Sequence, residues 1–254
     1  MKKEKISKPG IFQNQTFRIL LYILIVTTFL LVGYLFPNPT GKSVYTEEIA
    51  NVTRVVDGDT IETDLGKVRL LGVNTPEKNQ YYYEEAKNFL ASLEGKQIKL
   101  EIQGKDLFQR ILAYVIYDDR LIEEEILENG YGNYFTYNED KYTSRLKSAE
   151  KKAINKQIGV WELSQDECAR CIILMELNKE EPGEYIILKN NCGFDCSLYS
   201  WTIKDDVTHI TDLNFIVNAG HQKTINFEGA IWNDDHDTFF LRDDAGRLVL
   251  WYRY

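Results

Sequence analysis

The sequence predicts an α+β domain followed by an all-β domain, with a membrane-spanning helix before both. Three observations lead to this prediction: an uncharged apolar run near the amino end, strand-like and helix-like patterns in the middle, and strand-like runs alone near the carboxyl end. The chain has 254 residues, of which 44% are hydrophobic and 27% charged. This composition is sufficient for a buried core, and the length suits two modest domains.

The amino end has the pattern of an uncleaved membrane anchor. Residues 1–18 form a basic leader, and residues 19–36 are uncharged and mainly apolar. At about 1.5 Å per residue this run would span roughly 27 Å, close to the hydrocarbon thickness of a bilayer. A cleavable signal peptide is the alternative, but no small-x-small cleavage site follows. The positive-inside rule predicts a single-pass cell-membrane protein with a cytoplasmic leader and most of the chain outside the cytoplasm.

The part of the chain after the apolar run is acidic. The net charge of the chain is −9, and residues 1–36 contain five basic side chains and one acidic side chain, so the remainder carries about −13. Tight non-specific binding to nucleic acid usually requires a basic groove. Any activity on nucleic acid must therefore depend on a local group of residues.

Residues 37–47 lack apolar periodicity, which indicates a linker, and residues 48–163 have a mixed pattern. We expect strands at 49–56, 60–63, 67–73, 97–102 and 111–117. We expect helices at 84–93, 121–129 and 140–157. Short turns join the first three strands into a meander, and Trp161 is expected to fill the core of the domain.

Several polar residues of this domain have the types that phosphodiester hydrolysis requires. If the meander closes into a small barrel, Asp59 and Asn74 lie near one rim and offer oxygen ligands of the kind calcium accepts. Arg69 and Arg110 would supply planar, permanently charged groups that match a phosphate, which leaves Glu77 as the base. Taken singly, each arginine is more often part of a structural ion pair.

Three segments resemble the staphylococcal (thermo)nuclease family in order and spacing. They are Val-Asp-Gly-Asp-Thr at 56–60, Val-Arg-Leu-Leu-Gly-Val-Asn-Thr-Pro-Glu at 68–77, and Phe-Gln-Arg-Ile-Leu-Ala-Tyr at 108–114. The resemblance implies an OB-fold, a five-stranded barrel with about three helices, acting as a calcium-dependent endonuclease on DNA and RNA. It further implies Asp59, Asn74 and the backbone carbonyl of Thr75 as calcium ligands. Its catalytic residues would be Glu77 as general base or water orienter, with Arg69 and Arg110 on the phosphate.

The chain departs from this family pattern at two places. Asn74 stands where the family usually has an aspartate, so calcium should bind more weakly, and Asn74→Asp is expected to lower the calcium requirement. Leu107 and Phe108 stand where a basic residue and a tyrosine are frequent. Aromatic side chains could stack on the bases of single-stranded DNA or RNA, although core packing is at least as common for them. The candidates are Phe108, Tyr134, Phe135 and Tyr137.

Residues 172–254 have short strand-like runs, including 184–188, 239–242 and 248–252, which are typical of a β-sandwich. The segments 183–191, 201–205, 230–233 and 237–238 resemble a lamin-tail domain. That family implies an immunoglobulin-like sandwich that binds or positions an unidentified ligand and has no chemistry of its own.

All four cysteines lie near this second domain: Cys168, Cys171, Cys192 and Cys196. Outside the cytoplasm, such close pairs favour one or two disulfides. A zinc site and free thiols are the alternatives.

Two functions remain compatible with these features. The first is a membrane-anchored, extracytoplasmic, calcium-dependent nuclease. The second is a catalytically silent surface adhesin or nucleic-acid-binding module with the same two domains. Glu77, Arg69 and Arg110 favour the enzyme, because a silent module has no chemical need for all three.

Overall fold

The computed structural model describes residues 45–254 except 137, 181–182, 208, 230 and 233–236. The predicted leader (1–18), the predicted membrane helix (19–36) and most of the predicted linker (37–47) therefore lie outside the described residues. Within the described part, no helix is both long and apolar enough to cross a bilayer. Val44–Tyr254 form one compact unit.

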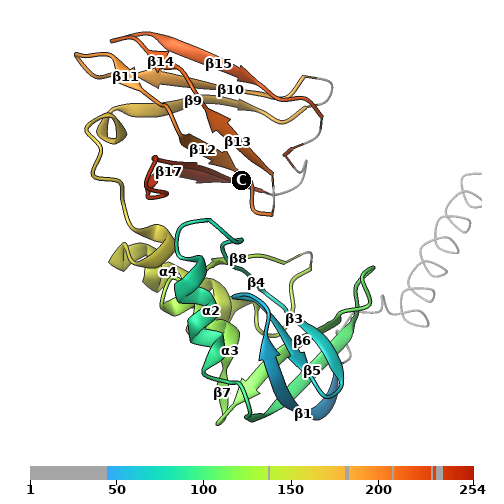
Figure 1. Cartoon of the computed structure of the whole chain (residues 1–254). Helices are drawn as coiled ribbons and strands as arrows, with labels where there is room; N and C mark the ends of the chain where they lie inside the picture. Colours follow the sequence, from blue (N-terminus) through green and yellow to red (C-terminus); the bar gives the residue numbers. More distant parts are fainter. Residues whose placement is uncertain (1–44, 137, 181–182, 208, 230, 233–236) are drawn as a thin grey trace, which may run out of the picture. The chain divides into compact units, whose positions relative to one another are not determined.

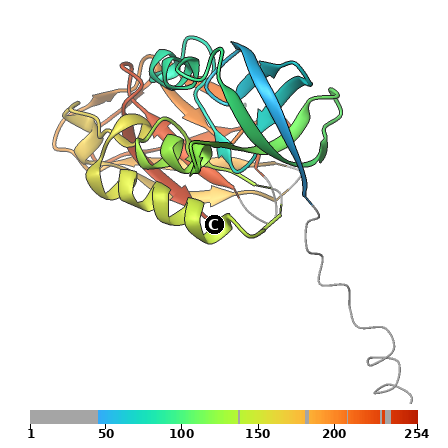
Figure 2. The ribbon, with the colours of Figure 1, turned by 90° about the horizontal axis from the view of Figure 1, so that it is seen from below.

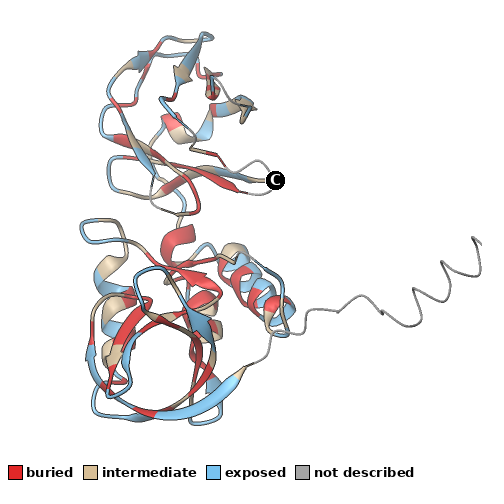
Figure 3. Cartoon of the chain, turned by 90° about the vertical axis from the view of Figure 1, so that its right-hand side faces the viewer, coloured by how far each residue is buried: buried red, intermediate tan, exposed pale blue. Residues whose placement is uncertain are grey.

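Five strands of this unit form a closed barrel, as predicted (Figure 1). They run in the order β3-β2-β1-β5-β6, and a parallel pairing of β3 with β6 closes the ring, which Figure 3 shows end-on. The strands are β1 (Thr46–Val55), β2 (Thr60–Thr63), β3 (Gly66–Leu70), β5 (Gln97–Lys105) and β6 (Ile111–Tyr117). The short strands β4 (Val73–Asn74) and β8 (Asn133–Tyr134) pair with each other, and β7 (Arg120–Leu121) pairs with β6. This arrangement with three helices is the OB-fold.

The three helices occur where the periodicity placed them. They are α2 (Tyr83–Ala91), α3 (Ile122–Glu128) and α4 (Thr143–Lys156), each shorter than predicted. Helix α4 begins after the predicted Asp140, whose Oδ1 accepts the Tyr142 N–H in the turn before the helix and whose Oδ2 accepts the hydroxyls of Tyr45 and Tyr114. Alternating strand residues such as Ile61 and Leu100 fill the barrel and are fully buried.

Residues 172–254, here called the C-terminal β region, contain only strands and turns among the described residues. One sheet has the order β15-β10-β9, another β13-β12-β16-β17, and β11 pairs with β14. The strands are β9 (Ile172–Asn178), β10 (Tyr185–Asn190), β11 (Cys196–Ser197), β12 (Trp201–Lys204), β13 (Ile210–Leu213), β14 (Ile216–Val217), β15 (Gln222–Asn226), β16 (Thr238–Arg242) and β17 (Leu248–Arg253). Residues of both larger sheets, such as Ile186 and Phe239, share one hydrophobic core.

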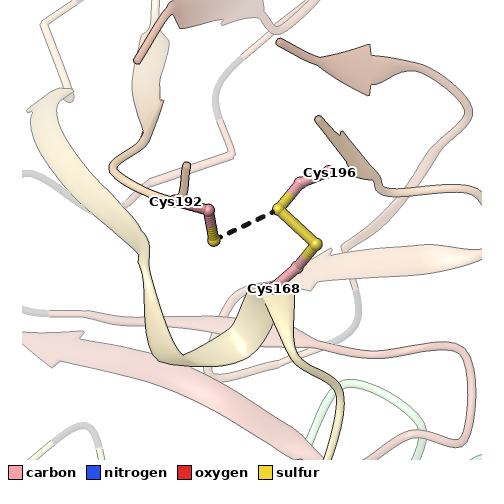
Figure 4. A group of neighbouring side chains, drawn as sticks. All are labelled: Cys168, Cys192 and Cys196. Carbon is pink, nitrogen blue, oxygen red and sulfur yellow. Dashed lines mark hydrogen bonds between the residues drawn. A yellow bond between two sulfur atoms is a disulfide. The ribbon is translucent and has the colours of Figure 1, made fainter. Parts of the chain in front are cut away.

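Two disulfides fasten the start of this region. Cys168, in the 3-10 helix η3 (Cys168–Arg170), is bonded to Cys196, and Cys171 is bonded to Cys192. The sulfur atoms of Cys192 and Cys196 lie 3.5 Å apart, so the two bridges are neighbours (Figure 4). Of the three alternatives that the sequence left open, which were disulfides, a zinc site and free thiols, the structure has the two disulfides.

The expectation that Trp161 fills the core of the barrel domain is wrong. Trp161 ends the 3-10 helix η2 (Gly159–Trp161) and is buried in a separate cluster with Phe240 and Leu248 of the C-terminal β region. Its ring centroid lies 5.8 Å from that of Phe240 and 5.4 Å from that of Trp251. An indole at the end of the barrel domain therefore packs against aromatic residues that lie some eighty positions later in the chain.

An ion pair joins helix α4 to strand β17, which lie side by side in Figure 2. The Arg253 guanidinium donates to both carboxylate oxygens of Glu150, at 2.7 and 3.0 Å. Glu150 is only 3% exposed and also accepts the backbone N–H of Tyr134. A buried carboxylate needs such a partner, so this pair ties the barrel domain to the C-terminal β region.

Candidate cation and phosphate site

Asp59 lies at the start of β2, where a tight turn brings its carboxylate against the loop after β4. Its Oδ2 atom accepts hydrogen bonds from the N–H and the hydroxyl of Thr75, at 3.0 and 3.1 Å. The preceding Gly58 permits this approach, because a Cβ there would lie 2.6 Å from Thr75 Oγ1 and 2.7 Å from the Ala86 side chain. The Asp-Gly-Asp segment therefore does more than reverse the chain, since its glycine allows Asp59 to be buried beside Thr75.

Asn74 lies on β4 and is 7% exposed. Its Oδ1 accepts a hydrogen bond from Arg69 Nη2 at 3.1 Å. Its Nδ2 donates to the backbone carbonyls of Asp206 and Val207 in the C-terminal β region, at 2.8 and 3.3 Å. The two ends of one amide thus contact the barrel and the C-terminal β region.

Arg69 links these two oxygen donors. Its Nη2 atom lies 3.2 Å from Asp59 Oδ2 and 3.1 Å from Asn74 Oδ1, while Nη1 donates to the carbonyls of Leu70 and Val73. One positively charged nitrogen therefore contacts both of the oxygens that the sequence predicted as cation ligands. A carboxylate and an amide, with a backbone carbonyl from Thr75, make a donor set that suits calcium. We call Asp59, Asn74 and Thr75 the candidate cation site.

Asp57, in the turn before β2, belongs to the same group, although it was not among the ligands that the sequence predicted. Its carboxylate accepts the backbone N–H of Asp59 at 3.2 Å. Burial and the neighbouring negative charge of Asp59 raise the pKa of Asp57 to about 6. Two carboxylates held this close favour a bound cation, because a cation offsets their repulsion. The spacing of two aspartates in one turn, at residues 57 and 59, was the pattern that could have indicated a role for Asp57.

Glu77 is exposed and lies just after Pro76. Its backbone is held in a turn, since its N–H donates to Gln80 Oε1 and its carbonyl accepts the Gln80 N–H. Among the described residues, no hydrogen bond or ion pair holds its carboxylate. The segment that follows Glu77 borders a cavity of about 410 Å³ whose lining includes Lys78 and Lys204. A carboxylate that is exposed and uncommitted is suited to accept a proton from water.

Arg110 lies one residue before β6, at the end of the exposed β5–β6 hairpin. The parallel register places Val68 opposite Ile111 and Arg69 opposite Leu112, so Arg110 directly precedes the strand that lies beside Arg69. Its Nε donates to Asp106 Oδ2 at 2.6 Å, and its guanidinium lies 5.6 Å from the centroid of the Phe108 ring. Phe108 itself is 81% exposed. Arg110 and Phe108 thus form an accessible pair, whereas Arg69 is held within the protein.

The predicted base-stacking residues differ in how exposed their rings are. Tyr134 is wrong as a stacking residue, because it is 7% exposed, packs in the barrel core and donates its hydroxyl to Thr143. Phe135 is partly buried and borders a cavity of about 320 Å³. Tyr137 lies outside the described residues. Phe108 is left as the aromatic residue with the most open face.

Comparison with known proteins gives matches to the barrel domain. Residues 67–163 match the family model for staphylococcal nuclease homologues. The thermonuclease of Staphylococcus intermedius is 36% identical over 125 residues, which cover 44% of this chain and 74% of that protein. The thermonuclease of Staphylococcus hyicus is 34% identical, over 48% of this chain and 80% of that protein. An uncharacterized endonuclease of Haemophilus influenzae is 32% identical, over 43% of this chain and 64% of that protein. Each match covers less than half of this chain.

The different environments of Arg69 and Arg110 give a testable difference in stability. Arg69→Ala is expected to lower the free energy of unfolding by about 2–4 kcal/mol, because it removes the side-chain donor to the Leu70 and Val73 carbonyls and leaves the buried Asp59 carboxylate without its compensating positive charge. Arg110→Ala, which removes a partly exposed pair, should cost less than about 1 kcal/mol. Chemical denaturation of the two variants measures this difference. Equal losses would contradict the structural role given to Arg69.

Proposed function

Because the chain belongs to the staphylococcal nuclease family, we propose that it is an endonuclease that hydrolyses phosphodiester bonds of DNA or RNA and depends on calcium. The observation that carries this proposal is the convergence of Asp59 Oδ2 and Asn74 Oδ1 on one positively charged nitrogen of Arg69. Glu77 lies three residues along the chain from Asn74, in the exposed segment that follows β4. The proposed cation ligands Asp59 and Asn74 contact Arg69 directly, and Glu77 would supply its carboxylate from the segment that follows them.

Calcium would be held by Asp59, Asn74 and the Thr75 carbonyl, with Asp57 adding negative charge. When bound, the ion supplies positive charge that stabilises the developing charge on the phosphate oxygens. Arg69 must exchange its contacts with Asp59 and Asn74 for a phosphate oxygen before it can assist. Arg110 can turn from Asp106 to the phosphate, since its side chain is partly exposed. Glu77 would take a proton from the attacking water.

The surface near the site favours single-stranded substrates. Phe108 lies beside Arg110 on the β5–β6 hairpin and offers an open ring face. Stacking of an unpaired base on such a ring is favourable for every base, so it provides affinity without sequence preference. This contact would partly offset the absence of a basic residue at Leu107.

We also propose that the chain is anchored in the cell membrane and works outside the cytoplasm. The basic leader and the apolar run at 19–36 support the anchor. The disulfides Cys168–Cys196 and Cys171–Cys192 support an oxidising location, because such bonds rarely persist in the cytoplasm. The C-terminal β region, with its shared core, would be an immunoglobulin-like lamin-tail domain that positions the enzyme on an unidentified ligand.

A second candidate function is supported by one specific observation. Arg69 is already fully engaged by Asp59, Asn74 and two carbonyls. A catalytically silent nucleic-acid-binding module or adhesin would tolerate this arrangement, since no phosphate would need the arginine. Loss of all cleavage with retained binding would identify that function.

The catalytic proposal predicts that the purified protein cleaves single-stranded DNA or RNA with calcium and stops when the calcium is chelated. Glu77→Gln and Arg110→Ala should each lower the cleavage rate on the order of 10²-fold, because each removes a group that acts in the transition state. The matched controls are Glu48→Gln and Arg120→Ala, which change an exposed glutamate and an exposed arginine elsewhere on the barrel. Their rates should equal that of the unchanged protein. Calcium-saturated protein without cleavage above the variants would favour the silent module.

The proposed topology predicts that the protein is found in the membrane fraction. Its C-terminal β region should be digested when protease is added to intact cells. The physical reason is that the apolar run holds the chain in the bilayer while the positive leader stays inside. An antibody against the carboxyl end follows the digestion, and an antibody against a cytoplasmic protein serves as the control. A full-length, protease-resistant protein in the soluble fraction would contradict the anchor.

A further inference from the structure

The groups around Asn74 permit only one of the two orientations of its side-chain amide. On one side lie two carbonyl oxygens, those of Asp206 and Val207, which can only accept. On the other side lies the guanidinium of Arg69, which can only donate. The NH₂ group must therefore face the C-terminal β region, and Oδ1 must face the candidate cation site.

The segment that carries the two acceptor carbonyls is held in place by several hydrogen bonds. It is the turn that follows β12, which we call the β12–β13 turn and describe through residues 205–207. The Asp205 carboxylate accepts the N–H groups of Val207 and His209. The ammonium of Lys204 donates to the carbonyls of Asp205 and Val207, at 3.2 and 2.7 Å. These bonds fix the direction in which the carbonyls of the turn point.

The side chain of Asp206 fixes the same turn against the barrel. Its Oδ1 accepts a hydrogen bond from Asn133 Nδ2 at 3.1 Å, and its Oδ2 accepts one from the Thr238 hydroxyl at 2.9 Å. Asn133 is the residue opposite Asn74 in the β4–β8 pairing. The β12–β13 turn thus contacts two neighbouring residues of the barrel domain, and all these groups are buried.

We propose that the β12–β13 turn is a positioning element of the cation site, which orients the Asn74 amide so that its oxygen faces the ion. This inference rests on the proposed function, because it assigns a role to the calcium ligands of the nuclease. It gives the C-terminal β region a part in catalysis that is separate from any ligand it binds. The turn itself touches neither ion nor substrate.

The same contact explains why residue 74 is an asparagine. An aspartate would place a charged oxygen against the carbonyls of Asp206 and Val207, at the positions where Nδ2 now lies 2.8 and 3.3 Å away. Repulsion between this carboxylate oxygen and the two buried carbonyl oxygens is unfavourable, because no hydrogen atom lies between them. The Asp206 carboxylate would add a like charge nearby. The sequence alone led to the expectation that Asn74→Asp lowers the calcium requirement, and the contacts of the amide reverse it. In this chain Asn74→Asp separates the turn from the barrel, and the extra carboxylate does not tighten calcium binding.

The test compares Asn74→Asp with the unchanged full chain by calorimetric calcium titration and by hydrogen exchange. We expect the dissociation constant for calcium to rise about tenfold, and the amides of Asp206 and Val207 to exchange at least tenfold faster. The cleavage rate at saturating calcium should change by only a few-fold, which a general loss of folding would not allow. The matched control is Asn129→Asp, which loses an amide-to-carbonyl bond of 2.8 Å to Glu125 within the barrel domain. It should leave both measurements unchanged.

A second variant changes only the C-terminal β region. Lys204→Met removes the donor that holds the Asp205 and Val207 carbonyls, and it should weaken calcium binding several-fold although every predicted ligand remains. Tighter calcium binding in Asn74→Asp with unchanged exchange, or unchanged binding in Lys204→Met, would overturn the inference. Calcium binding that follows these expectations without any cleavage of nucleic acid would overturn the proposed function and leave the inference standing. Absence of calcium binding in the unchanged chain would overturn both.

Discussion

The parallel pairing of β3 with β6 is the constraint on which the candidate site depends. Strands β1, β2 and β5 reach their neighbours through antiparallel pairings, and only the β3–β6 pairing turns the open sheet into a ring. The pairing sets Arg69 opposite Leu112 and so fixes where the arginine side chain emerges. It also sends the chain after β3 out of the ring, where β4 pairs with β8. Asn74 lies beside Asn133 for that reason.

Two buried carboxylates of the molecule are each compensated by an arginine. Asp59 is buried against Arg69, Glu150 against Arg253, and each carboxylate also accepts a backbone N–H. A buried carboxylate with such partners holds two segments together, because removing either partner leaves an uncompensated charge. At Asp59 the partner is also a candidate phosphate ligand. The same interaction that stabilises the free protein must therefore be exchanged during catalysis.

The C-terminal β region meets the barrel domain through several different contacts. Trp161 packs with Phe240 and Leu248, and the Arg242 guanidinium donates to the carbonyl of Val160 at 2.8 Å. Together with the β12–β13 turn, these contacts explain why Val44–Tyr254 form one compact unit. Through the carbonyls of Asp206 and Val207, this region also contacts Asn74 of the candidate cation site.

Local patterns in the sequence predicted the barrel strands and the three helices well. Strands 60–63 and 111–117 have the predicted ends, because turns lie on either side of both of them. Helix α4 begins three residues late, since Asp140 forms a turn before the helix, in which its carboxylate accepts the Tyr142 N–H and its N–H donates to the Thr143 hydroxyl.

The site was predicted less completely, because its decisive contacts join residues that are far apart in the sequence. Nothing near Asn74 indicates that its amide meets residues 206 and 207, which follow it by more than 130 positions. The spacing of Tyr134 fits a surface platform and a core position equally well, and only the packed structure decides between them. Trp161 is buried as expected, but by partners that a pattern of single residues does not identify.

A structure of the protein with calcium, located by the anomalous scattering of the ion, tests the central claim most directly. We expect one ion in contact with Asp59 and with Asn74 Oδ1, while Asn74 Nδ2 still donates to the Asp206 carbonyl and Arg69 Nη2 has left both oxygens. An ion bound elsewhere, with Arg69 still between Asp59 and Asn74, would contradict the claim that these residues form the metal site of a nuclease.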